Sequence, residues 1–457
     1  MNLKRYAAKG SSGDKTPEPY LEYKRIPKER YISQEFKQKE WEGVWKKVWF
    51  QAGLERDVKE PGDFFTTEIG NLSIIIIKGD DNKVRAFYNV CKHRGTQLRH
   101  QNCGHADSLK CPFHAWEYDR QGNLASVPDA ETFPAGTKDS SLNLTSIHCE
   151  AWAGWIFISL NQNPIPFESY ISDIKNQLEP YQFEKMDLIL DVTVEWNCNW
   201  KVGVDAFNES YHVMGTHPQL LDVLDDQNVQ IDLYEIHNRY LVPFGTPSPR
   251  LKNNGDISPA LASYMDQQGL DSDNFKGTAQ EVRREIQLFK RKNSQKEGYD
   301  YSGLNDDQLS DDYHYLIFPN LSLNIYSNNM MSFRHRPHPE DPNKMFFDVQ
   351  MFQMVPKGES EGKSHRSVIA KNIRTNEANK SLNVKQNESK SGRIEHVYIK
   401  EGTEHTLGQV IDQDAFNLPF VQKGMNSPAY EGLWCGSQER RIIHFNTVID
   451  DYIEGRR

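Results

Sequence analysis

The sequence predicts an α+β protein in which a small antiparallel β domain precedes a larger domain with an antiparallel sheet flanked by helices. Two observations predict this class. Strand-like segments dominate one early stretch of the chain, and later helical segments are grouped apart from the strands instead of alternating with them. The chain has 457 residues, which is enough for two or three domains with sizeable cores.

Composition restricts the possible functions. Hydrophobic residues make up 37% and charged residues 26% of the chain, as in an ordinary globular protein. The net charge of -10 offers no general attraction for nucleic acid or anionic membranes. The apolar runs at 74–77 and 151–158 are too short to cross a bilayer, and no apolar signal segment follows the first residues. We therefore expect a cytoplasmic protein that binds neither nucleic acid nor membranes.

The first part of the chain is predicted to contain an arm, a helix and a small β domain. Residues 8–19 are small, polar and rich in Pro and Gly, which predicts a mobile arm. Asn and Pro residues from Asn161 onwards indicate a boundary, so we place the β domain at residues 43–165. The expected elements are a helix at 35–50 and strands at 64–69, 72–78, 84–89 and 151–160.

The larger domain is assigned to residues 1–42 and 166–457. Its segment 357–392 is polar and rich in Ser, Asn and Lys, which predicts a mobile insertion, and 256–298 is expected to be helical. The other expected elements are helices at 171–179, at 200–211 and near the C-terminus, with strands at 188–194, 321–326, 330–336 and 346–355.

Two short loops in the β domain carry potential metal ligands. They are separated by 17 residues and contain Cys91 and His93 (CKHRG), then Cys111 and His114 (CPFHAW). A zinc site is one interpretation, with Cys103 and His105 as a competing register. A two-metal cluster is the other, because each loop offers one sulfur and one nitrogen. The cysteines outside the two loops are most simply buried apolar thiols: Cys103, Cys149, Cys198 and Cys435.

A second group of candidates lies on an expected helix that Asn199 would cap. One face of this helix is apolar and is expected to be core, with Trp200, Val204, Phe207 and Tyr211. A different face is polar, with Asp205, Asn208, Glu209 and His212. Gly215 and Pro218 would break the helix, so His217 could swing back and converge with His212.

Two histidines supply only part of an open iron(II) site, which a carboxylate would complete. Asp414 is the candidate, because it lies at the centre of an apolar helical stripe where an uncompensated carboxylate is costly. The stripe consists of Leu407, Val410, Ile411, Leu418 and, if Pro419 only kinks the helix, Val421. Asp412 would point to the opposite side. Glu209 lies one turn before His212 and could accept its ring N–H, with Asp205 as the alternative acid.

The order of these motifs resembles the catalytic alpha subunit of Rieske non-haem iron oxygenases of the aromatic ring-hydroxylating type. The resemblance covers most of residues 40–450 and rests on CxH and CxxH followed by HAWEYD, then NExYHxxxxH, QD and VQKG. It implies a Rieske domain and a helix-grip-like catalytic domain. It also implies that Cys91, His93, Cys111 and His114 bind a 2Fe–2S cluster, and that His212, His217 and Asp414 bind a mononuclear Fe(II).

By this resemblance, the protein hydroxylates an organic substrate with O2, as a monooxygenase or dioxygenase. Electrons come from NAD(P)H through a separate reductase and potentially a ferredoxin, because the chain has no nucleotide-binding loop. The chains of the family form head-to-tail trimers, in some members with a small beta subunit. Glu209 stands where many members have aspartate, and would bridge His212 to the cluster of a neighbouring subunit. Asn208 and Asp205 are further catalytic candidates.

The substrate is less defined by the sequence. Apolar residues after His217 could line a pocket for an aromatic hydrocarbon, which would place the protein in aromatic catabolism, but they could equally be core. Oxidation or demethylation of a quaternary amine such as a betaine is the alternative, since family members perform it and aromatic residues make up 11% of the chain. A Rieske electron carrier or a metal-stabilised binding protein is a third possibility.

Overall fold

The computed structural model describes residues 19–134, 139–356, 394 and 396–457. The expected insertion at 357–392, and all but the last residue of the expected arm, lie outside the described residues. The chain divides into two compact units. The smaller unit is Lys39–Ser172, and the larger unit combines Met1–Gln38 with Asp173–Arg457.

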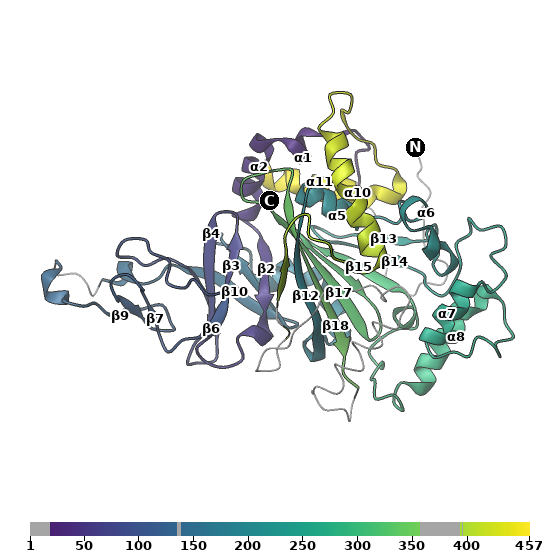
Figure 1. The fold of residues 1–457 in the computed structure, drawn as a ribbon, viewed down its shortest axis with the longest axis horizontal. Coiled ribbons are helices and arrows are strands. Elements are labelled where there is room, and N and C mark those ends of the chain that lie inside the picture. The colour runs from purple at the N-terminus through teal and green to yellow at the C-terminus, as the bar shows by residue number, and fades with distance from the viewer. Residues whose placement is uncertain (1–18, 135–138, 357–393, 395) are drawn as a thin grey trace. The chain divides into compact units, whose positions relative to one another are not determined.

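The smaller unit contains two antiparallel sheets (Figure 1). The seven-stranded sheet has the order β2-β11-β10-β5-β4-β3-β6, and the three-stranded sheet has the order β7-β8-β9. The strands are β2 (Trp49–Leu54), β3 (Asp63–Ile69), β4 (Leu72–Lys78), β5 (Val84–Tyr88), β6 (Cys103–His105), β7 (Leu109–Lys110), β8 (Glu117–Tyr118), β9 (Leu124–Ser126), β10 (Ser146–Trp152) and β11 (Trp155–Ser159).

Three of the predicted strands appear at or near their predicted positions, and two other predictions need correction. The helix expected over 35–50 is α2 (Gln34–Glu40) followed by a π-helical turn, because Trp49 and Phe50 already belong to β2. The strand expected over 151–160 is instead a hairpin of β10 and β11. The chain turns there at Ala153 and Gly154, which both have positive φ.

The larger unit is built on one eight-stranded sheet of order β13-β14-β15-β16-β17-β18-β12-β19. Neighbouring strands are antiparallel except β12 and β19, which are parallel. The strands are β12 (Met186–Trp196), β13 (Gln230–Leu233), β14 (Asn238–Val242), β15 (Asp312–Ile317), β16 (Leu321–Ile325), β17 (Asn329–Pro337), β18 (Met345–Met354) and β19 (Val397–Ile399). A separate pair joins β1 (Ile26–Pro27) to β20 (Gly432–Leu433).

Helices cover one face of this sheet (Figure 1). α5 packs against β17 and β18, α11 packs against β13, and α10 contacts α5. The pair α7 and α8 forms a separate core and occupies the stretch that was expected to be helical. The helices of the larger unit are α1 (Glu29–Ile32), α4 (Ser172–Leu178), which begins at the last residue of the smaller unit, α5 (Trp200–Ala206), α6 (Val213–Thr216), α7 (Pro259–Gln267), α8 (Ala279–Asn293), α10 (Gln409–Met425) and α11 (Arg440–Ile453). Helix α3 (Phe167–Tyr170) belongs to the smaller unit. Among the described residues, no helix combines the length and apolarity that crossing a bilayer requires.

Candidate functional site

The two Cys and His loops of the smaller unit share one backbone design. In each loop the cysteine N–H donates to the carbonyl of the residue five positions later, and the N–H four positions later donates back to the cysteine carbonyl. The residue at that fourth position has positive φ in both loops, 80° at Gly95 and 59° at Ala115. Cys91 and Cys111 therefore begin equivalent tight turns.

The side chains of these loops gather into two pairs of like atoms. Cys91 and Cys111 are both buried in one core cluster, and the Cys91 sulfur lies 3.4 Å from the Tyr118 hydroxyl. Burial raises the pKa of the Cys91 thiol, and the adjacent Cys111 thiol adds to the rise. The rings of His93 and His114 are 4.6 Å apart between centroids. Each loop thus contributes one sulfur and one imidazole.

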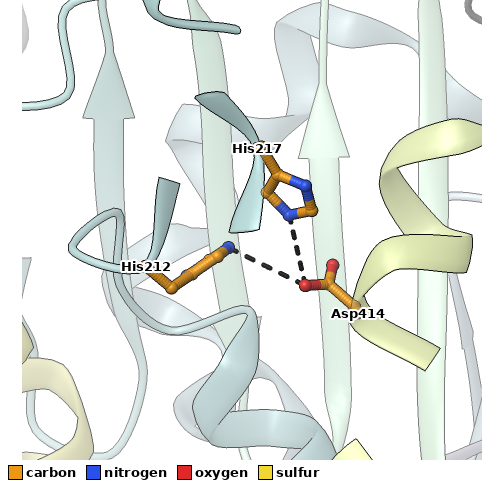
Figure 2. A group of neighbouring side chains, drawn as sticks. All are labelled: His212, His217 and Asp414. Atoms are coloured by element: carbon orange, nitrogen blue, oxygen red, sulfur yellow. Dashed lines mark ion pairs between the residues drawn. The ribbon is translucent and has the colours of Figure 1, made fainter. Parts of the chain in front are cut away.

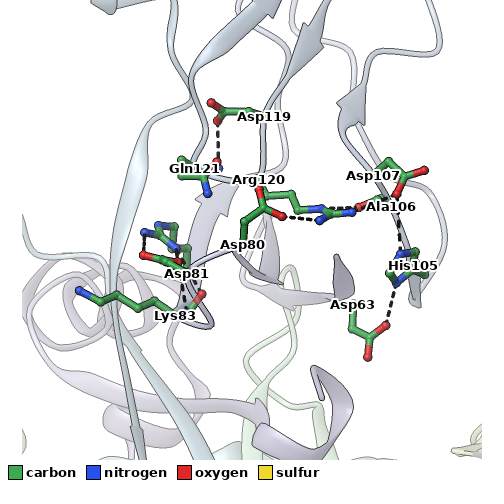
Figure 3. Close-up of polar contacts among 11 residues, drawn as sticks. Asp63, Asp80, Asp81, Lys83, His105, Ala106, Asp107, Asp119, Arg120 and Gln121 are labelled. Carbon is green, nitrogen blue, oxygen red and sulfur yellow. Dashed lines mark hydrogen bonds and ion pairs between the residues drawn. The ribbon is translucent and has the colours of Figure 1, made fainter. Parts of the chain in front are cut away.

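The competing register, Cys103 and His105, lies in a different environment, and Figure 3 shows the surroundings of His105. Cys103 is exposed, which corrects the expectation of a buried thiol, because β6 is the edge strand of its sheet. His105 Nδ1 lies 3.1 Å from Asp63 Oδ1, within a surface network that also includes Arg120 and Asp107. Cys198 is buried as expected, and the other two cysteines are partly buried. In this register, His105 contacts acids and Cys103 is exposed, whereas Cys91 and Cys111 are buried.

In the larger unit, the ligand atoms of His212, His217 and Asp414 lie within 4.8 Å of one another (Figure 2). Asp414 Oδ1 is 3.1 Å from His217 Nε2 and 3.9 Å from His212 Nε2. His217 and Asp414 are buried. In the part of the chain that the structure describes, this is the one group of three or more potential ligands so arranged.

The local fold that brings the two histidines together differs from the expected long helix. Asn199 caps α5 as predicted, by accepting the N–H of Lys201, but α5 ends at Ala206. Tyr211 is consequently 53% exposed and is not core, whereas the other three residues of the apolar stripe are buried. The four-residue helix α6 separates the histidines, with His212 at its N-cap and His217 at its C-cap. Both imidazoles can therefore face Asp414 without sharing one helical face.

Glu209 holds His212 at two points. Its Oε1 lies 2.8 Å from His212 Nδ1, and its Oε2 accepts the His212 backbone N–H at 2.9 Å. Burial alone would lower the pKa of His212, but the charges of Glu209 and Asp414 raise it overall. A carboxylate that accepts the Nδ1 proton leaves Nε2 as the nitrogen available to a metal.

The other two polar candidates of this segment occupy different positions. Asp205 accepts the Tyr31 hydroxyl at 2.7 Å, and burial raises the pKa of Asp205 to about 7. It therefore binds Tyr31 and does not share Glu209's contact with His212. Asn208 is fully buried, and neither of its side-chain polar atoms has a hydrogen-bond partner among the residues that the structure describes.

Gln413 is a site residue that the sequence reasoning missed. Its Oε1 lies 2.7 Å from His217 Nδ1 and also accepts the Gln219 amide at 2.7 Å. A histidine that binds a metal through one ring nitrogen needs an acceptor for the N–H of the other. The glutamine directly before Asp414 in the QD pair was the sequence feature that could have identified this acceptor. Asp412 instead accepts the backbone N–H of Leu407 at 2.8 Å, next to the start of α10.

The apolar residues after His217 pack as core. Leu221 and Leu224 belong to one cluster with Val213 and Tyr240, while Val223 belongs to the cluster of α7 and α8. These contacts are to other side chains of the larger unit, so this group gives no separate support for an aromatic substrate.

Two family descriptions match this chain. Residues 183–455, more than half of the chain, match "Ring hydroxylating alpha subunit (catalytic domain)". Residues 48–143 match "Rieske [2Fe-2S] domain". These matches identify the cofactors as a Rieske 2Fe–2S cluster and a mononuclear iron.

Curated relatives cover part of the chain. It is 31% identical over 199 residues to the glycine betaine monooxygenase oxygenase subunit of Pseudomonas aeruginosa, which covers 44% of this chain and 46% of that one. It is 28% identical over 218 residues to the benzene 1,2-dioxygenase subunit alpha of Pseudomonas putida, which covers 46% and 48%. In these alignments, the chain spans about half the length of the curated relatives it matches.

The likeness to solved structures extends over nearly the whole chain. A quaternary ammonium Rieske monooxygenase superposes with a TM-score of 0.66 at 19% identity, covering 96% of this chain and 99% of that one. This confirms the predicted fold class, a small antiparallel Rieske domain with a larger domain of sheet and helices. The chain therefore belongs to the ring-hydroxylating alpha-subunit family of Rieske non-haem iron oxygenases.

Proposed function

We propose that this protein is the oxygenase component of a Rieske-type system. It would take electrons from a separate NAD(P)H-dependent reductase, with or without an intervening ferredoxin, and hydroxylate a small organic substrate. Substrate C–H, O2, NAD(P)H and one proton would give C–OH, water and NAD(P)+. The observation that carries the proposal is the convergence of His212, His217 and Asp414 within 4.8 Å.

The three side chains fit a mononuclear iron(II). Two imidazoles and one carboxylate are the donor set of the facial triad, which leaves positions open for O2. The Nε2 atom of His217 is buried and faces Asp414 Oδ1 at 3.1 Å but makes no hydrogen bond within the described residues. The Nδ1 atoms of both histidines are held by side-chain acceptors. When bound, the iron supplies the redox chemistry with O2. The chain fixes the tautomers and orientations of its ligands.

The loops of the smaller unit fit a 2Fe–2S cluster. We propose that Cys91 and Cys111 bind one iron, and that His93 and His114 bind the other. The pairing of like atoms supports this assignment. His93 Nδ1 is also buried and has no hydrogen-bond partner in the described part of the chain, which leaves it available to a metal.

We further propose that electrons pass between subunits of a homotrimer through Glu209. Its contact with His212 Nδ1 supports this route, and so do the neighbouring side chains of Tyr211 and Met214, which are exposed and mostly apolar. A head-to-tail contact of this kind closes into a ring. The solved quaternary ammonium Rieske monooxygenase gave insights into inter-subunit electron transfer in that protein. A small beta subunit is a further potential partner.

Mixed trimers test this route. A Cys91→Ser chain lacks the cluster and a His212→Ala chain lacks the catalytic iron, so each should be inactive alone. Co-expression would place an intact cluster beside an intact iron at some interfaces and should recover part of the activity. Verified mixed trimers without recovery would refute the inter-subunit route.

For the substrate, we propose a quaternary ammonium compound. The support is the similarity to a glycine betaine monooxygenase subunit and to a quaternary ammonium Rieske monooxygenase. An aromatic hydrocarbon is the second candidate, supported by the similarity to a benzene dioxygenase subunit. The proposed location is the cytoplasm, which the six free cysteines support.

Oxygen uptake with a surrogate reductase tests the proposed function. Betaines, choline-like alcohols and aromatic compounds would be compared, and iron would be counted per chain. We expect three irons per chain and O2 uptake that depends on a quaternary amine. Two irons per chain and no O2 uptake with any compound would instead indicate an electron carrier.

A further inference from the structure

Arg441, on α11, is a buried cation without an anionic partner. Its side chain is wholly buried, and its Nε donates to Asn238 Oδ1 at 2.6 Å. Its Nη2 donates to His314 Nδ1 at 2.9 Å, and its guanidinium lies 4.4 Å from the centre of the Tyr240 ring. Within the described chain, no carboxylate pairs with it and Nη1 has no hydrogen-bond partner. A buried charge in this state is costly, which indicates a missing anion.

Over the described ranges of the chain, two further donors also lack partners: one on His314, which contacts Arg441, and one on Asn324, which is paired with His314. His314 accepts a hydrogen bond at Nδ1, and a guanidinium can only donate, so the imidazole proton must be on Nε2. Burial lowers the pKa of His314 well below its ordinary value, which keeps the ring neutral. Its Nε2–H is buried without a partner, as is the Nδ2 amide of Asn324. These groups all donate hydrogen bonds, and only an acceptor can satisfy them.

These residues lie on one face of the sheet. Tyr240 on β14 is directly opposite His314 on β15, and His314 is directly opposite Asn324 on β16. Directly opposed residues point to the same side of a sheet. Because Arg441 contacts both Tyr240 and His314, this is the face that α11 covers. The donors therefore form a row beneath one helix.

Asp312, an acid on the same face of the sheet, does not neutralise Arg441. Asp312 lies two residues before His314 and so shares its face. Burial raises the pKa of Asp312 to about 8, so its carboxyl group is mostly protonated at neutral pH. Burial lowers the pKa of Arg441 only to about 9, so the guanidinium stays charged. The set keeps a net positive charge.

The donor set is coupled to the proposed iron site. The charge of Glu209 acts on Arg441, and the charges of Glu209 and Asp414 both act on the Tyr240 hydroxyl. Tyr240 also packs in one cluster with Val213, the residue that follows His212. Tyr240 therefore connects the donor set to the segment that carries His212.

We propose that Arg441, His314 and Asn324 form a carboxylate-binding subsite for the substrate. An arginine fork matches a carboxylate, and the two neutral donors suit its remaining lone pairs. The inference rests on the proposed function and narrows the substrate to a zwitterion, a quaternary ammonium carboxylate. Its carboxylate binds Arg441 and its N-methyl groups lie towards His212, His217 and Asp414.

Calorimetric binding to the iron-loaded enzyme tests the subsite. Two matched pairs serve as probes, glycine betaine with choline and benzoate with benzyl alcohol. We expect the wild-type enzyme to prefer glycine betaine over choline. A carboxylate preference confined to the benzoate pair would overturn the quaternary ammonium carboxylate as the substrate. Arg441→Gln should weaken carboxylate binding by about 10- to 100-fold and change alcohol binding by less than about twofold. Arg440→Gln, which alters another buried arginine of α11, is the matched control and should keep the preference.

Asn324→Leu keeps the test decisive if Arg441→Gln fails to fold. It removes one neutral donor and should weaken carboxylate binding by about 3- to 10-fold. The subsite is overturned if the wild-type enzyme shows no carboxylate preference, or if the folded variants weaken both members of a pair equally. An Arg441-dependent preference without O2 uptake from any compound would retain the subsite and refute the oxygenase function. O2 uptake without a carboxylate preference would retain the oxygenase function and refute the subsite.

Discussion

Glu209 contacts His212 with both of its carboxylate oxygens, one on the ring nitrogen at 2.8 Å and one on the backbone N–H at 2.9 Å. The two contacts fix the position of the imidazole as well as its tautomer. The backbone contact is possible because α5 has already ended at Ala206, so the His212 N–H is not used in a hydrogen bond within that helix.

Glu209→Gln should separate these two roles. The amide can keep one hydrogen bond to His212 but loses the negative charge that favours the Nδ1 proton. We expect the cluster to stay intact, the iron content to fall by less than about twofold, and turnover to fall by about 10- to 100-fold. Visible absorption would report on the cluster, iron analysis on the iron content and O2 uptake on turnover. Wild-type turnover would exclude Glu209 from the electron route.

Asp414→Ala should remove the mononuclear iron and all turnover. The carboxylate is the one acid among the three converging ligands, and the cluster loops belong to the other unit. The cluster spectrum should therefore persist. The control is Asp412→Ala, which removes an acceptor for the Leu407 N–H and should cost about 1 kcal/mol of stability without loss of iron. Equal iron loss in both variants would contradict the assignment.

Gln413→Leu should weaken iron binding by about 10- to 100-fold, because His217 loses the acceptor that orients its ring. Gln413→Glu keeps an acceptor and should restore binding. The measurement is iron retained against a graded chelator, a readout that a merely structural role would not move. Gln219→Ala, which removes only the amide that contacts Gln413, should have a smaller effect. An unchanged chelator profile in Gln413→Leu would remove Gln413 from the site.

Some of the site could be read from the sequence because its pattern is regular. Asp414 was distinguished from Asp412 by the apolar stripe of α10, and Ile411, Asp414 and Leu418 are indeed buried together. The helix continues through Pro419, as the prediction allowed. Val421 is exposed, however, because the buried face continues through Gln422. The periodicity of apolar residues identified the buried face of α10, but it did not identify Gln422 as the polar residue that extends this face.

Other parts of the fold could not be predicted from the sequence, because buried polar residues interrupt the apolar pattern that is typical of a strand. Strands β13, β14 and β15 were not predicted. In β14 and β15, the positions on the face of α11 include Asn238, Asp312 and His314, where a strand pattern expects apolar residues. The same residues form or surround the Arg441 donor set. Local rules fail most at functional positions, and here that failure marks the proposed subsite.

Cys91→Ser should abolish the 2Fe–2S cluster, whereas Cys103→Ser should leave it unchanged. Cys91 is buried beside Cys111, while Cys103 is exposed at the edge of the sheet. The red-brown absorption and the paramagnetic signal of the reduced protein report on the cluster directly. The opposite result would assign the cluster to the register of Cys103 and His105.

Asp205→Asn should change how stability depends on pH. Burial raises the pKa of Asp205 in the folded chain from its ordinary value of 3.8 to about 7. Between these values the unfolded chain releases a proton that the folded chain keeps, so the stabilising contribution is full below about pH 4 and is lost as pH rises to 7. Asparagine does not titrate and can still accept the Tyr31 hydroxyl. The free energy of unfolding would be measured by denaturant titration for the variant and for the wild-type protein. From pH 5 to pH 7, the value for the variant should rise relative to the wild-type value by an amount on the order of a few kcal/mol. Above pH 7, the difference between the two should stay level. A difference that is constant from pH 5 to pH 8 would show that Asp205 ionises normally in the folded protein.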